Sequence, residues 1–167
     1  MDREDSVTMY TDGACIGNPG AGGYGVLLLS GGRRKELSGG YRKTTNNRME
    51  MMAVIEGLRA LKRGGDVIVH SDSQYVVNAV NQGWAKRWKA NSWRRNKNER
   101  ALNPDLWDEL LDQIGRHDVE LKWVRGHAGD PGNERADALA VEAAKGRDLA
   151  VDTGYEAQRT RPSGTMF

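Results

Sequence analysis

The sequence contains one cysteine, Cys15, among 167 residues, and it has no long apolar run. A single cysteine cannot form an internal disulfide, so nothing in the sequence requires an oxidising compartment. The apolar runs fall far short of the roughly 20 residues that a membrane-spanning helix needs. The acidic N-terminus also lacks the pattern of a signal peptide. We therefore expect a cytoplasmic protein that makes no contact with a membrane.

A large net charge is also missing, because the whole chain carries only +2. The positive charge is nevertheless concentrated, since residues 84–100 hold seven Lys and Arg against one acid, Glu99. The rest of the chain carries 18 basic and 22 acidic residues, a net charge of −4. A positive segment on a mildly acidic body is typical of a protein that binds a phosphate backbone at one place. The alternative is a solvated surface loop.

The residue pattern predicts one α/β domain, for which 167 residues with 38% hydrophobic content suffice. Alternating and β-branched stretches predict strands at residues 6–11, 24–30, 35–41, 67–70 and 119–124. Helical spacing and capping residues predict helices at residues 46–62, 73–81, 84–89, 104–114 and 130–144. The glycine-rich residues 13–23 predict a turn, and no periodic pattern follows residue 148. This order predicts a five-stranded mixed sheet, with the first three strands antiparallel and helices on both faces.

Four carboxylates occupy positions that favour one shared site. Asp12 ends the first predicted strand beside Gly13, which permits close approach, and Asp72 follows the fourth strand. Adjacent central strands bring these two together at one edge of the sheet, where open α/β sheets bind ligands. Glu50 and Asp137 flank the apolar stripes of their helices, within reach of the same edge. Each also has a structural alternative: a turn residue for Asp12, a helix cap for Asp72 and surface charges for the other two.

Clustered carboxylates repel one another unless cations neutralise them, so the arrangement favours a metal site with oxygen ligands. Mg²⁺ is the natural occupant and Mn²⁺ an alternative. Two such ions, about 3.5–4 Å apart, hold a phosphodiester, activate a water and stabilise the leaving oxygen. His127 lies in a glycine-rich loop that leaves its imidazole exposed, and near such a centre it would relay protons or assist product release. The alternative is a loop histidine with no role in the chemistry.

The basic segment also carries Trp84 and Trp88, four residues apart and interleaved with Lys86, Arg87 and Lys89. Aromatic rings beside cations pack against the sugars and phosphates of a nucleic-acid strand. The alternative is that both tryptophans anchor a short helix in the core. A set of amides near the proposed centre suits either hydrogen bonds in a nucleic-acid groove or capping, and it comprises Asn18, Asn46, Asn47 and Gln74.

Five short motifs follow one another along the chain. They are Thr11-Asp12-Gly13 with Gly17-Asn18-Pro19-Gly20, Thr45-Asn46-Asn47-Arg48-Met49-Glu50, Ser71-Asp72-Ser73-Gln74-Tyr75, Gly126-His127-Ala128-Gly129, and Asn133-Glu134-Arg135-Ala136-Asp137. Any one motif is weak, but together and in this order they resemble bacterial type 1 ribonuclease H. The similarity extends from about Val7 to Tyr155. It includes residues 84–100, which resemble that family's basic protrusion.

The resemblance implies an enzyme that hydrolyses the RNA strand of an RNA–DNA hybrid internally, leaving 5′-phosphate and 3′-hydroxyl ends. It implies that the four carboxylates bind the metal ions and that His127 is a mobile accessory residue. It places the four amides in contact with the hybrid near the cut, where 2′-hydroxyls are read in the minor groove. Lys43, Thr45 and Asn103 would line a pocket for a phosphate of the DNA strand, although Asn103 equally suits a helix N-cap.

The resemblance also sets the domain limits. Residues 1–155 form a single ribonuclease H domain, and residues 156–167 form a C-terminal tail with no assigned structure. Nothing in the sequence indicates an obligate partner besides the hybrid, so a monomer is expected.

Three other functions are compatible with this fold class. A module that binds hybrids without cutting them does not need all four acids. An integrase or transposase core would carry additional DNA-binding domains, for which the chain has little room. An actin-like phosphotransferase needs two such domains and a nucleotide cleft, which 167 residues do not supply.

Overall fold

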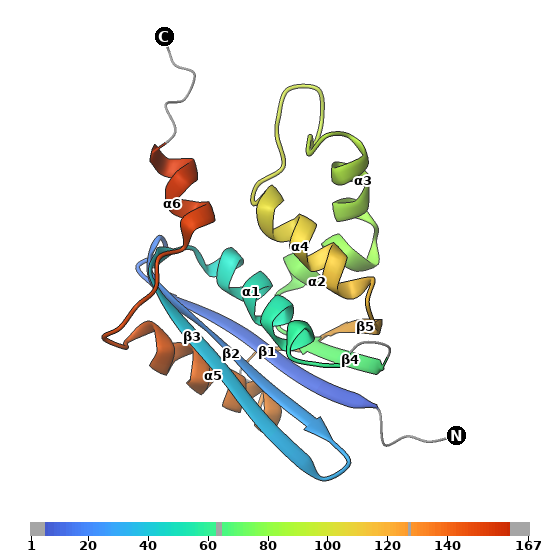
Figure 1. The fold of residues 1–167 in the computed structure, drawn as a ribbon, viewed down its shortest axis with the longest axis vertical. Helices are drawn as coiled ribbons and strands as arrows, with labels where there is room; N and C mark the ends of the chain where they lie inside the picture. The colour runs from blue at the N-terminus through green and yellow to red at the C-terminus, as the bar shows by residue number, and fades with distance from the viewer. Residues whose placement is uncertain (1–5, 63–64, 127, 161–167) are drawn as a thin grey trace.

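The computed structural model describes residues 6–62, 65–126 and 128–160, in which five strands form one mixed sheet with helices on both faces (Figure 1). The strands are β1 (Val7–Ile16), β2 (Gly20–Ser30), β3 (Arg33–Thr44), β4 (Asp66–Ser71) and β5 (Asp118–Trp123). The helices are α1 (Asn46–Arg59), α2 (Gln74–Asn81), α3 (Trp84–Ala90), α4 (Pro104–Ile114), α5 (Pro131–Ala144) and α6 (Thr153–Thr160). The strand order is β3-β2-β1-β4-β5; β1, β2 and β3 are antiparallel, β4 is parallel to β1, and β5 is parallel to β4. The predicted fold class is confirmed.

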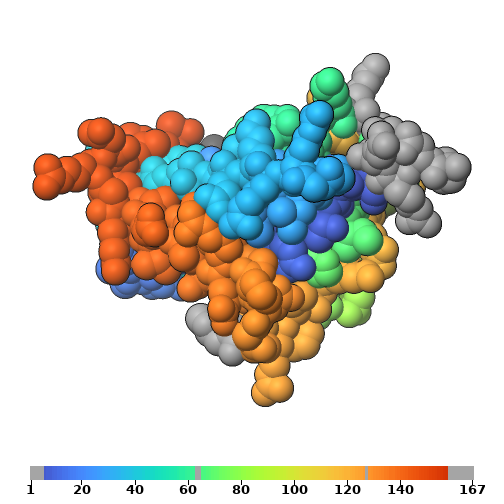
Figure 2. Space-filling view, turned by 90° about the horizontal axis from the view of Figure 1, so that it is seen from below, coloured from blue at the N-terminus to red at the C-terminus, as the bar shows by residue number. Residues whose placement is uncertain are grey.

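The glycine-rich residues 13–23 belong mostly to β1 and β2, so the prediction of a turn along this whole stretch is wrong. Most of these glycines permit close packing instead of reversing the chain. A Cβ on Gly23 would overlap the carbonyl oxygen of Ala140, and one on Gly25, in the same strand, would overlap that of Ala136. Helix α5 therefore lies directly on the backbone of β2, and Figure 2 shows it (orange) packed against β2 and β3 (blue).

Helix α1 covers the other face of the sheet, and its apolar stripe lies at the centre of the core. The helix begins after Thr45, whose Oγ1 accepts a hydrogen bond from the Arg48 backbone N–H at 3.2 Å. The stripe consists of fully buried side chains, with Met51, Val54, Ile55 and Leu58 as its main members. Helix α4 packs against α1 and contributes the fully buried Trp107. None of the helices in the described ranges is long and apolar enough to span a membrane.

The β2–β3 hairpin turns at Gly31 and Gly32, between the strands predicted at residues 24–30 and 35–41. Both adopt left-handed backbone angles, with φ of +53° and +82°, which glycine tolerates without strain. Strand β3 forms one edge of the sheet, and the three residues that begin it are exposed cations: Arg33, Arg34 and Lys35.

The segment after residue 148 has regular structure, contrary to the prediction. Ala150 pairs with the edge strand β3, where Arg42 N donates to its carbonyl oxygen at 2.8 Å. Helix α6 follows, and the Asp152 carboxylate accepts a hydrogen bond from Tyr155 N at 3.2 Å. Helix α6 carries one large apolar side chain, Tyr155, so no apolar stripe marks it in the sequence, and contacts with distant residues stabilise it. The remaining predicted tail, residues 161–167, lies outside the described residues.

Candidate active site

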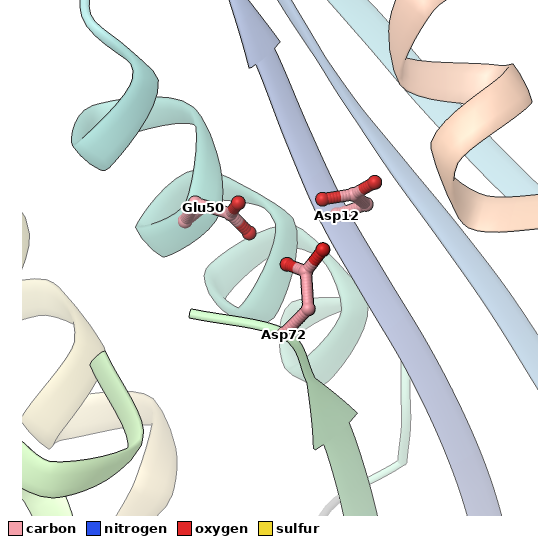
Figure 3. A group of neighbouring side chains, drawn as sticks. All are labelled: Asp12, Glu50 and Asp72. Carbon is pink, nitrogen blue, oxygen red and sulfur yellow. The ribbon is translucent and has the colours of Figure 1, made fainter. Parts of the chain in front are cut away.

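Three carboxylates converge where β1 and β4 lie side by side (Figure 3). Strand β4 pairs in parallel with β1 up to Thr11 and Ser71, so Asp12 and Asp72 follow at adjacent positions. Glu50 reaches the same point from the beginning of α1. One carboxylate oxygen from each of the three residues lies within 4.8 Å of the others. The structure therefore brings together three of the four carboxylates singled out in the sequence.

The sequence pattern predicted that Asp12 ends its strand, and this prediction is wrong. Asp12 pairs with Gly25 inside β1, because β1 continues along β2 as far as Ile16 after its pairing with β4 has ended. The carboxylate consequently lies in the interior of the sheet, where only 3% of the residue is exposed.

Gly13 is the reason that Glu50 can reach this position. A Cβ on Gly13 would overlap the backbone nitrogen of Glu50 and lie 2.6 Å from the carbonyl carbon of Met49. Without that Cβ, the first turns of α1 lie directly on β1. The close approach that the sequence indicated at Gly13 thus positions a carboxylate.

Burial and mutual repulsion raise the pKa of these acids. Burial, followed by the charge of Asp72 and by contact with Asp137, raises the pKa of Asp12 from its ordinary 3.8 to about 8. Burial, followed by the charges of Asp12 and Asp72, raises the pKa of Glu50 well above its usual range. The cluster is therefore short of positive charge.

Two oxygens of the cluster are also short of hydrogen-bond partners. Glu50 Oε1 and Asp72 Oδ1 are buried and accept no hydrogen bond from the described residues. An unpaired buried oxygen is costly, and most in native proteins are paired. A hard divalent cation with oxygen ligands would satisfy both atoms and offset the repulsion. The residues present thus fit such a cation.

The fourth predicted ligand, Asp137, lies on α5 at the other side of Asp12. It is half-buried, and it is close enough to Asp12 to raise the pKa of that carboxyl group. It is not one of the three residues whose oxygens lie within 4.8 Å of one another. His127 lies outside the described residues, but its neighbour Gly126 is against Asp72, where a Cβ would come within 2.9 Å of Oδ2.

Two contacts hold the backbone around Asp72, and the sequence did not indicate the first of them. The exposed Trp123 donates from its indole Nε1 to the carbonyl oxygen of Asp72 at 3.1 Å. The N-cap of α2 is Ser73, whose hydroxyl accepts from Val76 N at 3.2 Å. Asp72 is therefore not the cap that one interpretation of the sequence allowed, and its carboxylate is available for the cluster.

The predicted substrate contacts lie along the beginnings of α1, α2 and α4. Asn18 accepts a hydrogen bond from the backbone nitrogen of Asn46 at 3.0 Å, which joins the β1–β2 turn to α1. Lys43, Asn47 and Gln74 are exposed near these helix ends. Their side chains are available to a ligand.

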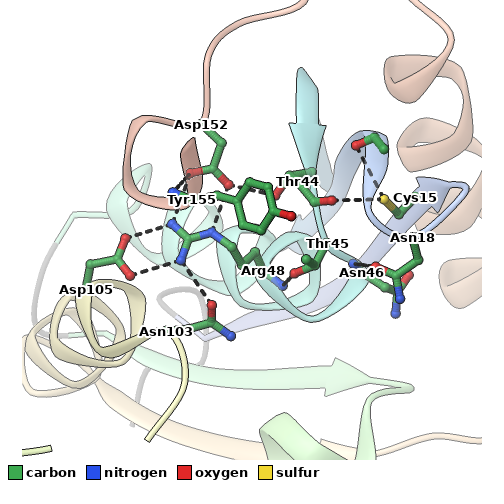
Figure 4. A network of polar contacts seen from close by, with 11 residues as sticks. Cys15, Asn18, Thr44, Thr45, Asn46, Arg48, Asn103, Asp105, Asp152 and Tyr155 are labelled. Carbon is green, nitrogen blue, oxygen red and sulfur yellow. Dashed lines mark hydrogen bonds and ion pairs between the residues drawn. The ribbon is translucent and has the colours of Figure 1, made fainter. Parts of the chain in front are cut away.

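Asn103 occupies the N-cap position of α4, but its side chain makes no capping hydrogen bond. Its amide oxygen instead accepts from Arg48 Nη1 at 3.1 Å (Figure 4). The interpretation of Asn103 as a simple side-chain cap is therefore wrong, because a buried arginine takes the oxygen that would cap the helix.

Helix α3 forms the first part of the basic segment, residues 84–90. Its two tryptophans, Trp84 and Trp88, are partly buried against the core. The ring of Trp88 meets that of Trp107 edge-on, with centroids 5.9 Å apart, and Trp84 lies beside Trp88. The anchoring role proposed as an alternative is thus present for both. Lys86 and Arg87 are exposed, whereas Lys89 pairs with Asp108 of α4 at 2.8 Å.

Known proteins are similar to this chain in sequence and in fold. A model of the RNase H family matches residues 4–145. Ribonuclease H of Syntrophus aciditrophicus is 62% identical over 154 residues, which cover 92% of this chain and 89% of that protein. The crystal structure of LC9-RNase H1, a type 1 RNase H with the type 2 active-site motif, aligns with a TM-score of 0.76 and 36% identity over 93% of this chain and 81% of that one. LC11-RNase H1, solved in complex with an RNA/DNA hybrid, shares the fold at a TM-score of 0.61 and 24% identity, over 83% of this chain and 96% of that one. The carboxylate cluster lies within the matched residues, and the chain belongs to the RNase H family.

Proposed function

We propose that this chain is an endonuclease that hydrolyses the RNA strand of RNA–DNA hybrids and leaves 5′-phosphate and 3′-hydroxyl ends. The observation that carries the proposal is the buried cluster of Asp12, Glu50 and Asp72, in which two oxygens have no partner among the described residues. Family membership and the relatives named ribonuclease H support the reaction class.

Asp12, Glu50, Asp72 and Asp137 would hold two divalent cations, with Mg²⁺ the expected ion and Mn²⁺ a substitute. Such ions orient a phosphodiester, lower the pKa of a water and stabilise the leaving oxygen. The chain contributes rigid placement of the four carboxylates from β1, β4, α1 and α5. Because burial and mutual repulsion raise the pKa of both Asp12 and Glu50, cation binding would release protons from the cluster.

His127 is proposed as the accessory group that relays protons or helps the product leave. This role is supported by its chain neighbour, Gly126, which lies against the carboxylate of Asp72. Imidazole is suited to it, since its ordinary pKa lies near neutral pH.

Three groups of residues are proposed to bind the hybrid. The first contacts it near the cut and reads the RNA strand in the minor groove, where 2′-hydroxyls distinguish RNA from DNA, and it comprises Asn18, Asn46, Asn47 and Gln74. The second binds a phosphate of the DNA strand, and it comprises Lys43, Thr45 and Asn103. The third is in the basic segment, which packs against the sugars and phosphates of the hybrid through Trp84, Lys86, Arg87, Trp88 and Lys89. The exposure of Lys86 and Arg87 supports this assignment, whereas Lys89 would have to leave Asp108. The chain is expected to act as a cytoplasmic monomer.

The test is cleavage of end-labelled RNA–DNA hybrid, double-stranded DNA and double-stranded RNA, each with Mg²⁺ and with a chelator. We expect cuts only in the RNA of the hybrid and only with metal. Cleavage of DNA would instead favour an integrase-like enzyme. Binding of the hybrid without cleavage would favour a binding module.

A further inference from the structure

Arg48 is a fully buried cation near the beginning of α1, with 1% of its side chain exposed. All five N–H groups of its guanidinium have acceptors (Figure 4). Nε and Nη2 donate to Asp152 at 2.8 and 3.0 Å, Nη1 and Nη2 to Asp105 at 2.9 and 2.7 Å, and Nη1 to Asn103 at 3.1 Å. Because no donor is left, Arg48 has no hydrogen bond to offer a substrate.

The contacts of Arg48 determine which atoms its neighbours present to a ligand. A guanidinium can only donate, so the oxygen of the Asn103 amide must point toward Arg48 and its NH₂ must point away. Thr45 is fixed by the helix backbone instead: the backbone N–H of residue 48 donates to its Oγ1, which leaves the hydroxyl proton to be donated elsewhere. In the described part of the chain, neither the Asn103 NH₂ nor the Thr45 hydroxyl proton has an acceptor. Both residues therefore present donors, as an anion requires.

Asp152 holds Arg48 from a part of the chain that the family model does not cover, since the match ends at residue 145. Its carboxylate is 3% exposed, and it also accepts from the Thr44 hydroxyl at 2.6 Å and from Tyr155 N at 3.2 Å. The last of these hydrogen bonds caps the first turn of α6. Formation of α6 and fixation of Arg48 thus depend on the same carboxylate.

We infer that Arg48 and Asp152 are positioning residues, which orient Asn103 to bind, together with Thr45, one phosphate of the DNA strand. The inference rests on the proposed function for the identity of the bound strand. It assigns the C-terminal segment, through Asp152, to the substrate-binding side of the molecule. Arg48 acts through its neighbours, and neither it nor Asp152 touches the substrate.

The network of Arg48, Asp105 and Asp152 could act on a bound phosphate through its charge or by orienting Asn103. The two explanations predict opposite results for Asp152→Asn. Arg48 with Asp105 and Asp152 carries a net charge of −1, since one cation faces two carboxylates. If the network acted only through its charge, Asp152→Asn would remove a negative charge and strengthen the binding of a phosphate. If it acts by orientation, the same variant releases Arg48 and weakens binding.

The experiment measures equilibrium binding of the full chain to hybrids in a chelator. One DNA-strand phosphate at a time is replaced by an uncharged methylphosphonate, and the affinity is compared with that for the unmodified hybrid. In the wild type we expect one position at which replacement lowers affinity about tenfold, the scale of one or two charge-assisted hydrogen bonds. In Arg48→Lys and in Asp152→Asn, the unmodified hybrid should bind about tenfold more weakly, and replacement at that position should have no further effect. In Mg²⁺ the variants should raise KM and leave kcat unchanged.

The matched control is Ile55→Ala, which creates a cavity in the same helix and leaves the polar network intact. It should lower the melting temperature and keep the wild-type methylphosphonate profile. Lys has three donors on one nitrogen and cannot make the two bidentate contacts with Asp105 and Asp152, so Arg48→Lys keeps the charge and loses the orientation. Asp152→Asn provides the second route if Arg48→Lys does not fold.

An unchanged profile in both variants would overturn the inference, as would tighter binding by Asp152→Asn. A wild type that cleaves the hybrid but has no sensitive DNA phosphate would also overturn it and leave the proposed function intact. A wild type that shows the sensitive position but cuts nothing would refute the proposed function alone.

Discussion

Helix α1 begins between two clusters of carboxylates that are balanced in opposite ways. Arg48 binds Asp105 and Asp152 with four of its guanidinium N–H groups and Asn103 with the fifth. Two residues later, Glu50 meets Asp12 and Asp72 with no cation among the described residues. Burial, followed by the charge of Asp72, raises the pKa of Asp12 to about 8. Asp152 is also buried, but the hydrogen bonds that it accepts from Arg48 and Thr44 outweigh burial and lower its pKa. We call Arg48, Asp105 and Asp152 the complete cluster, because the chain itself supplies its cation. We call Asp12, Glu50 and Asp72 the incomplete cluster, because a bound cation would have to balance its charge.

The largest expected effect is that of Asp12→Asn, which removes one ligand of the incomplete cluster. Cleavage should fall by more than about a thousandfold in Mg²⁺, because the site no longer holds its cations in place. Hybrid binding should persist, since the basic segment is unchanged. The same variant should raise the stability of the metal-free protein, because it relieves repulsion. Normal turnover with Mg²⁺ would contradict the assignment of Asp12.

Gly13→Ala tests whether the incomplete cluster depends on the close approach of α1. The new Cβ would overlap the Glu50 backbone and shift the helix. A displacement of about 1 Å at an active site can lower the rate roughly 100-fold. The control is Gly115→Ala, whose Cβ would meet its nearest neighbours at 3.5 Å, an ordinary contact. Equal activity of the two variants would show that α1 adjusts without moving Glu50.

The two clusters should also give opposite dependences of stability on pH. The pKa of Asp12 is raised on folding, so its contribution is complete below 3.8 and is lost as the pH rises through about 8. The pKa of Asp152 is lowered on folding, so its contribution is present above 3.8 and is lost as the pH falls. Each pKa unit corresponds to about 1.4 kcal/mol, and the alkaline loss should amount to several kcal/mol.

Urea denaturation in the presence of a chelator, repeated across this pH range, measures the slope of the free energy of unfolding against pH. The alkaline slope reports on Asp12 and the acidic slope on Asp152. Asp12→Asn should reduce the alkaline slope, to which Glu50 also contributes, and Asp152→Asn should reduce the acidic one. Mg²⁺ should also reduce the alkaline slope, because cations replace the protons. A slope that its own variant leaves unchanged would assign the effect to another group.

The smallest effect is expected from a variant that touches neither cluster. Replacing the exposed Lys86 and Arg87 by Ala should weaken hybrid binding and reduce the slope of log K against log salt by up to about 0.9 for each lost phosphate contact. Thermal stability and metal affinity should stay at the wild-type values. If the salt slope does not change, α3 is not at the interface.

Much of the incomplete cluster could be predicted from the sequence, because its residues follow recognisable signals. Asp12 and Asp72 follow apolar strand residues, and Gly13 marks a close approach of the backbone. The complete cluster was missed, although one signal was present: Arg48 lies on the apolar stripe of α1, three residues before Met51 and seven before Ile55. A charge on that stripe indicates a buried partner.

Its partner Asp152 could not be identified from local pattern. The contact joins residues 104 positions apart, and α6 carries only one large apolar side chain, Tyr155, which makes no apolar stripe. The turn predicted at residues 13–23 failed for a related reason. Glycine marks a special backbone position, but only the packed structure shows whether the neighbour is a turn or a helix such as α5.

The pairing of Ala150 with β3 also bears on aggregation. An edge strand with free N–H and C=O groups is a template on which another chain can add. At one end of β3, the C-terminal segment takes these groups through Ala150. At the other end, Arg33, Arg34 and Lys35 place like charges where a second copy would have to approach. A chain shortened before residue 150 would thus lose α6 and would also expose the edge of β3 to pairing with another chain.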